Sequence, residues 1–196
     1  PYVLINMVMS ADGRATIESN ENGLGSDVDQ RLMRELRAVA DMVLVGAGTL
    51  RATGASSRVR DDDLEQLRID REKTRNPISA VITRSGDLPL ERLFFTAVDF
   101  DSVVYLSQEA SVERKEAIEA TGRPVVALDS DDELASMLLH MREKLQVDVL
   151  LVEGGPTLNG DLFSQGLVDE FFLTLGSVVV GGEPTLSPVT GMGKPT

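Results

Sequence analysis

Three short stretches of glycine, hydroxyl and arginine residues follow apolar runs and could together hold an anionic ligand. They are Gly46-Ala47-Gly48-Thr49, Thr83-Arg84-Ser85 and Gly154-Gly155-Pro156-Thr157-Leu158. Glycine lets a ligand approach the backbone closely, and a helix amino terminus offers N–H groups to a phosphate. An arginine flanked by hydroxyls can bind a second phosphate. Each stretch alone would also fit an ordinary turn, but all three together predict a site for a multiply phosphorylated ligand such as a dinucleotide.

Other common catalytic sites have little basis in this sequence. It contains no cysteine and one histidine, His140, so disulfides, thiolate metal sites and Ser-His-Asp or Cys-His catalysis are not indicated. We therefore expect no bound metal. His140 falls off the apolar stripe of its predicted helix, and we expect it to be exposed. The glycines match neither Gly-x-Gly-x-x-Gly nor a P-loop.

The composition narrows the classes of partner. The 196 residues carry a formal net charge of −13, which argues against a nucleic-acid partner, because phosphate backbones bind surplus lysine and arginine. No apolar run approaches the roughly 20 residues of a membrane helix, so we expect no membrane contact. The lack of cysteine agrees with a reducing cytoplasm. The length is most simply that of one domain.

Apolar runs and amphipathic segments alternate along the chain. The predicted strands are Tyr2–Met9, Asp41–Gly46, Ile78–Thr83, Val103–Ser107, Pro124–Leu128, Val147–Val152 and Asp169–Leu175, with a further one at Val178–Val180. The predicted helices run from Ser26 to about Ala40, over Ser111–Thr121, from Ser130 to about Leu145 and over Thr157–Gln165. The charged segment Asp61–Arg75 is expected to be a solvated helix or a mobile excursion. Such alternation predicts a parallel α/β sheet with helices on both faces, and places the three ligand stretches at one edge.

Five motifs occur in a fixed order, and together they carry a resemblance. They are Ser10-Ala11-Asp12-Gly13, Arg37-Ala38-Val39-Ala40-Asp41, Val45-Gly46-Ala47-Gly48-Thr49, Glu153-Gly154-Gly155-Pro156-Thr157-Leu158 and Gly166-Leu167-Val168-Asp169-Glu170. With them the sequence resembles the riboflavin-biosynthesis reductases, the reductase domain of the bifunctional deaminase-reductase, over almost its whole length.

The resemblance implies a dihydrofolate reductase-like fold: three layers, α/β/α, around a mostly parallel sheet with an antiparallel strand or strands at the C-terminal end. Residues 1–196 would form a single reductase domain, and we expect the given sequence to lack the last strand or hairpin of that fold. The implied activity is NADPH-dependent reduction of the ribosyl group of 5-amino-6-(5-phosphoribosylamino)uracil to ribityl. A homodimer is also implied, and the apolar segment after Glu170 points the same way, since it is too hydrophobic for a bare sheet edge.

The site residues expected from the resemblance fall into three groups. Asp12 and Glu153 are candidates for the catalytic step, and Asn6, Met9, Arg37 and Arg58 are candidates for substrate binding. The cofactor candidates are Gly46, Ala47, Gly48, Thr49, Thr83, Arg84, Gly154, Gly155, Pro156, Thr157 and Leu158, with Thr83 and Arg84 on the 2′-phosphate of NADPH.

One segment departs from the family pattern. Leu50–Arg58 lacks the acidic pair and the proline that many members carry there, and either Arg58 or Arg60 could replace their substrate-holding arginine. The substrate therefore stays open between the pyrimidine ribotide and a dihydropterin. A nucleotide-binding module that has lost catalysis is a further alternative.

Overall fold

The computed structural model describes residues 1–16, 23–128, 132–182 and 186–191. Seven strands form one sheet in the order β5-β4-β3-β2-β6-β1-β7. Their bounds are β1 Tyr2–Ser10, β2 Met42–Gly46, β3 Ile78–Thr83, β4 Ser102–Ser107, β5 Val125–Leu128, β6 Val149–Val152 and β7 Glu170–Gly176. All neighbouring pairs among them are parallel, so their carboxyl ends meet at one edge of the sheet.

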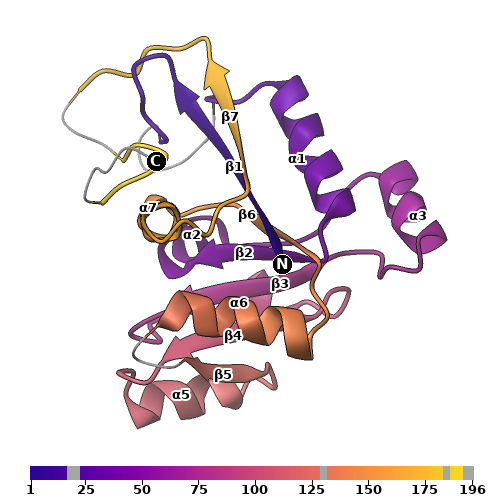
Figure 1. Ribbon diagram of the computed structural model, residues 1–196, viewed down its shortest axis with the longest axis vertical. Helices are drawn as coiled ribbons and strands as arrows, with labels where there is room; N and C mark the ends of the chain where they lie inside the picture. Colours follow the sequence, from indigo (N-terminus) through magenta and orange to yellow (C-terminus); the bar gives the residue numbers. More distant parts are fainter. Residues whose placement is uncertain (17–22, 129–131, 183–185, 192–196) are drawn as a thin grey trace.

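Helices cover both faces of this sheet (Figure 1). They are α1 Asp27–Val39, α2 Ala47–Thr53, α3 Asp62–Asp70, α4 Leu93–Thr96, α5 Val112–Glu119, α6 Glu133–Lys144 and α7 Pro156–Ser164. Alternate residues along the central strands explain the layering. In β2, Met42 and Leu44 pack in the cluster that contains residues of α6 and α7, whereas Val43 packs with Leu36 of α1. Two apolar faces per strand are what a parallel sheet requires, and the three-layer α/β/α prediction is confirmed.

The predicted antiparallel C-terminal strand is wrong for the part of the chain that the structure describes. β7 runs parallel to β1, with Asn6 opposite Phe172 in the register. The reason is the crossover through α7, which returns the chain to the amino-terminal edge before β7 begins. The predicted strand at Val178–Val180 is also missing, because the backbone there serves another purpose: the N–H of Val180 donates to the carboxylate of Asp12.

Several helix boundaries differ from the predicted ones. The helix expected to begin at Ser130 is capped instead by Asp132, whose carboxylate accepts the N–H of Ala135; residues 129–131 lie outside the described part of the chain. Two short helices, α2 and α4, were not predicted. His140 was expected to be exposed, but it is only partly so, because its Nδ1 lies 3.1 Å from the hydroxyl of buried Tyr105.

Helix α3 is not merely a solvated helix, because the side chain of one of its arginines, Arg68, is buried in the protein interior. Arg68 is 1% exposed. Its guanidinium donates to the carbonyl oxygens of Arg37 and Ala38 in the last turn of α1 and of Ala40, the C-cap of that helix. It also donates to the carbonyl oxygen of Thr74. Burial lowers the pKa of Arg68. A helix end leaves carbonyls without intrahelical partners, so Arg68 fixes the end of α1 against α3.

Candidate active site

A cleft of about 1520 Å³ lies where β2, β3 and β6 end; we call it the large cleft. Its lining includes Gly46–Thr49 after β2, Thr83–Ser85 after β3 and Gly154–Leu158 after β6, together with Asp132–Ala135 at the start of α6. The turns after β2 and β6 are bonded to each other, because the N–H of Gly46 donates to the carbonyl of Gly154 at 2.8 Å. The three stretches that the sequence pattern grouped thus do line one space.

The two glycines after β6 differ in what they require. Gly154 has φ +84°, a left-handed conformation that side chains rarely adopt, and its peptide bond to Gly155 is cis. Gly155 has φ −80° and is the N-cap of α7, with no side chain capping the helix. A Cβ on Gly155 would lie 3.3 Å from Oγ1 of Thr49, whereas one on Gly48 would meet nothing within 4 Å. The first N–H groups of α7 therefore begin at the cleft without a side-chain cap, as an anion-binding helix end requires.

Thr83 and Arg84 occupy different positions at the cleft. The Thr83 side chain is buried, and its Oγ1 accepts the N–H of Gly86 at 3.1 Å. The side chain of Arg84 is three-quarters exposed, and its Nε is 3.9 Å from the carboxylate of Glu133. A pair at that distance and exposure is weak, so the guanidinium of Arg84 can turn toward a bound anion.

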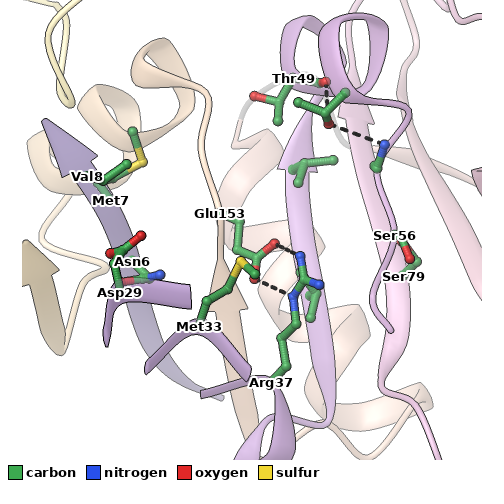
Figure 2. A pocket seen from close by; sticks show the side chains of 14 residues that line it. Asn6, Met7, Val8, Asp29, Met33, Arg37, Thr49, Ser56, Ser79 and Glu153 are labelled. Atoms are coloured by element: carbon green, nitrogen blue, oxygen red, sulfur yellow. Dashed lines mark hydrogen bonds and ion pairs between the residues drawn. The ribbon is translucent and has the colours of Figure 1, made fainter. Parts of the chain in front are cut away.

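A second space, of about 160 Å³, lies between the sheet and α1; we call it the small cavity (Figure 2). Its floor is the α1-facing side of β1, β2 and β3, and three α1 residues form one wall. The lining consists of Asn6, Met7, Val8, Asp29, Met33, Arg37, Val43, Val45, Thr49, Thr53, Ala55, Ser56, Ser79 and Glu153. Met7, Thr49 and Thr53 also line the large cleft, so the two spaces adjoin at these residues.

An ion pair joins two elements across the small cavity. Arg37 of α1 donates from Nε and Nη2 to the two carboxylate oxygens of Glu153, both at 2.7 Å (Figure 2). The two side chains are only 11% and 14% exposed. Nη1 of Arg37 donates to the carbonyl of Arg58, and the carbonyl of Arg37 accepts from Arg68. This two-pronged geometry orients Glu153 firmly.

Two other polar side chains of the small cavity hold buried oxygens that accept no hydrogen bond from the described part of the chain. Oδ1 of Asn6 and Oδ1 of Asp29 have almost no contact with solvent, and neither accepts a hydrogen bond from the described residues. Asn6 follows Ile5, which pairs with Val152, so Asn6 lies beside Glu153. Buried acceptors are nearly always bonded in proteins, so these oxygens are where a ligand with N–H or O–H donors would bind.

Three predicted site residues line neither space. The carboxylate of Asp12 accepts the Ser10 hydroxyl and the N–H groups of Val180 and Gly181, and these bonds lower its pKa, the Ser10 bond most. It thus holds the chain after β7 in place. Met9 is part of neither lining. Arg58 pairs bidentately with Asp99, at 2.7 and 2.8 Å, and lies over the Phe100 ring.

Other lining residues were not singled out from the sequence. Asp29 and Met33 share one face of α1 with Arg37, at successive spacings of four residues. That spacing was available in the sequence as a signal. Asp29 also takes part in the start of α1, since the Ser26 hydroxyl accepts the Asp29 N–H at 3.4 Å. Ser79 was part of a predicted strand but not of a site.

Comparison with known proteins decides the family. The model of the RibD C-terminal domain matches residues 1–195. The chain belongs to this family. It is 31% identical over 183 residues to the 2,5-diamino-6-ribosylamino-4(3H)-pyrimidinone 5′-phosphate reductase of Archaeoglobus fulgidus, covering 93% of this chain and 83% of that protein. It is 28% identical over 189 residues to the riboflavin biosynthesis protein RibD of Escherichia coli, covering 93% of this chain and half of that protein.

Solved structures of two other proteins share the fold. A pyrimidine reductase-like protein from Corynebacterium diphtheriae superposes with a TM-score of 0.83 at 20% identity, covering 92% of this chain and 76% of that one. Acinetobacter baumannii RibD superposes with a TM-score of 0.78 at 18% identity, covering 99% of this chain and 51% of that one. The family match over residues 1–195 confirms the resemblance found in the five sequence motifs. No helix among the described residues is long and apolar enough to cross a membrane.

Proposed function

We propose that this chain is an NADPH-dependent reductase that converts the ribosyl group of a pyrimidine ribotide to ribityl. The observation that carries the proposal is the junction of the two spaces. A large cleft with glycine-rich strand ends, suited to a dinucleotide, adjoins a small polar cavity suited to a heterocyclic base, and Met7, Thr49 and Thr53 line both. The name of the Archaeoglobus relative, a pyrimidinone 5′-phosphate reductase, supports reduction of a pyrimidine ribotide, and the name of RibD supports a place in riboflavin biosynthesis.

The chain's own groups fit a nicotinamide dinucleotide in the large cleft. Gly46–Thr49 and Gly154–Leu158 would hold its pyrophosphate and ribose through backbone N–H groups, and the open space above Gly48 leaves room for close approach. Thr83 and Arg84 would bind the 2′-phosphate that distinguishes NADPH from NADH. When bound, the reduced nicotinamide supplies a hydride.

The residues of the small cavity would orient the base so that its sugar carbon C1′ faces the junction. The reduction adds a hydride to C1′ and a proton to the ring oxygen, which opens the ribose to the ribityl chain. Glu153 is better placed than Asp12 to bind the substrate or direct that proton, since it lines the cavity and Arg37 fixes its orientation. Arg37 would act mainly through Glu153.

We further infer a homodimer through β7. This strand lies at the edge of the sheet among the described residues, and one face of it exposes Phe171, Leu173 and Leu175 at 36%, 39% and 64%. An exposed apolar edge strand invites pairing with another chain, and a second copy of this chain would cover it. The absence of cysteine agrees with a cytoplasmic enzyme.

The test is reduction of the pyrimidine ribotide with NADPH, followed by mass spectrometry of the product. The proposal predicts NADPH oxidation with the ribotide and a product heavier by two hydrogens, and little oxidation with dihydrofolate. Turnover of dihydrofolate in preference to the ribotide would favour a pterin reductase. Binding of NADPH without turnover of either would contradict an enzymatic function.

A further inference from the structure

We propose that the chain after β7 forms a strap that positions the cofactor in the large cleft, and that Asp12 is the residue that fixes this strap. The strap consists of residues 178–182 and 186–191, which only three residues separate in the sequence. This inference depends on the proposed function, since it concerns how tightly the large cleft holds NADPH. It assigns Asp12 a positioning role, although this motif residue lines neither space.

The first part of the strap is bound to the segment that follows β1, beside which it lies in Figure 1. The carboxylate of Asp12 accepts the N–H of Val180 on Oδ1 at 3.1 Å and that of Gly181 on Oδ2 at 2.8 Å. Oδ1 also accepts the Ser10 hydroxyl at 2.6 Å. Gly181 has φ +65°, a conformation in which successive N–H groups can face one anion. Asp12 therefore holds the strap against the end of β1.

The second part of the strap is seated on α7. The N–H of Thr190 donates to the carbonyl of Pro156 at 3.0 Å, and Nδ2 of Asn159 donates to the carbonyl of Pro188 at 2.8 Å. Glycine weakens a helix interior, yet Gly160 lies within α7. A Cβ at this position would overlap the carbonyl oxygen of Thr190. Gly160 therefore provides the space in which the strap meets the helix.

The strap also forms part of the wall of the large cleft. The N–H of Ala15 donates to the carbonyl of Leu186 at 2.8 Å, and both residues line the cleft. Leu186 is half-exposed, and a bound cofactor would cover this apolar surface. Because the strap is bonded to Pro156, the first residue of α7, its displacement would shift both this wall and the helix end that would hold the pyrophosphate.

A proton-transfer role for Asp12 fits its contacts less well. The bond from the Ser10 hydroxyl, followed by those from the two strap N–H groups, lowers the pKa of Asp12, so the carboxyl is ionised at neutral pH and has no proton to donate. A general acid must also reach the reacting atoms, whereas Asp12 lines neither the large cleft nor the small cavity. Its carboxylate instead binds the strap, and the strap lines the cleft at Leu186.

The experiment measures the NADPH dissociation constant by isothermal titration calorimetry, together with the apo melting temperature, in the wild type and in Asp12→Asn. Asparagine has a single acceptor oxygen and would turn an NH2 group toward one of the strap N–H groups. We expect the dissociation constant to rise about tenfold, the effect of losing roughly one hydrogen bond to a charged group. The KM for NADPH should rise with it, while kcat at saturating NADPH and ribotide stays near the wild-type value, as expected for a residue that only positions the cofactor.

Asp101→Asn is the matched control for the loss of charge. Asp101 is exposed and directly precedes β4, so it lies at the amino-terminal edge of the sheet, away from the large cleft. Its substitution should leave the NADPH dissociation constant at the wild-type value. A lowered melting temperature with unchanged NADPH affinity in Asp12→Asn would show that the strap only completes the fold, and would overturn the inference while leaving the reductase function intact. A wild type that binds no NADPH contradicts the proposed function itself.

Gly160→Ala tests the other end of the strap and decides the outcome if Asp12→Asn fails to fold. Alanine is the better helix former, so without a seated strap this substitution should raise the melting temperature and leave NADPH affinity unchanged, a result that would overturn the inference. We expect it instead to weaken NADPH binding. In the double variant the two losses should not add, because both substitutions release the same strap. Fully additive losses would contradict a single strap.

Discussion

The large cleft and the small cavity are built in different ways. The cleft is made mostly of turns that directly follow strands, so its ligand groups are backbone N–H groups and glycines within a few residues of each other. The small cavity is made of side chains that come from separate parts of the chain, and its central pair, Arg37 and Glu153, is separated by 116 residues. A site of local turns should tolerate side-chain changes, whereas a site of distant side chains should depend on the packing between elements.

The largest expected effect is therefore at the small cavity. Glu153→Ala leaves the guanidinium of Arg37 nearly buried without its carboxylate, which should cost about 3–5 kcal/mol of unfolding free energy and abolish turnover. Glu35→Ala is the control, because it removes the partner of Arg31 in an exposed pair on the same helix and should cost under about 1 kcal/mol. Chemical denaturation measures both. Equal costs would show that the Arg37–Glu153 pair does not hold α1 on the sheet.

A second effect should appear one step further from the cavity. Arg68→Met keeps the volume but leaves the carbonyls at the end of α1 without their donor, with an expected loss of about 2–4 kcal/mol. Arg37 belongs to the turn of α1 whose carbonyls Arg68 binds, and its side chain holds Glu153 in the small cavity. We therefore expect kcat/KM to fall while NADPH affinity stays near the wild-type value. Arg71→Met, at an exposed position just after α3, is the control. A loss of NADPH affinity equal to the loss in kcat/KM would contradict separate roles for the two spaces.

Loss of the Arg84 charge at the large cleft should weaken NADPH binding without changing stability. Arg84→Ala should raise the KM for NADPH about tenfold or more, since a hydrogen bond to a charged group contributes roughly 1.5–3 kcal/mol. The KM for NADH and the melting temperature should stay near their wild-type values, because Arg84 is three-quarters exposed. Steady-state kinetics with both cofactors measures the difference. An equal change for NADH would remove Arg84 from the 2′-phosphate site.

The smallest expected effects are those of alanine substitutions at Gly154 and Gly155, the two glycines of the turn between β6 and α7, and they should differ in kind. Gly154→Ala places a side chain at φ +84° and should lower stability by about 1 kcal/mol or more without any ligand. Gly155→Ala has an ordinary φ of −80°, and its Cβ would meet only Oγ1 of Thr49, at 3.3 Å. It should leave the apo melting temperature nearly unchanged and weaken NADPH binding. Unchanged NADPH affinity in Gly155→Ala would mean that the turn serves only to connect β6 to α7.

The same contrast explains how much could be predicted from the sequence. Buried strands such as Ile78–Thr83 and the turns after them are local patterns, so the sheet and the lining of the cleft were predicted. The contacts of Arg58 and Arg68 were not, because the sequence around an arginine gives no sign of which distant carbonyl or carboxylate the guanidinium will bind. Asp12 shows the reverse case: this motif residue was predicted for the active site, and it lines neither space while its carboxylate accepts the N–H groups of Val180 and Gly181, contacts that the motif itself does not indicate. The direction of β7 depended on the α7 crossover, which residue patterns alone do not orient.

The central claim is that the two spaces form one active site that meets at Met7, Thr49 and Thr53. The most direct measurement is the fate of deuterium from NADPH labelled at C4 of the nicotinamide, on the face that is transferred, during turnover of the pyrimidine ribotide. Our account predicts a ribityl product with one deuterium at C1′, found by mass spectrometry and NMR. A product whose C1′ carries only hydrogen from solvent, formed while NADPH is oxidised, would contradict direct transfer between the large cleft and the small cavity.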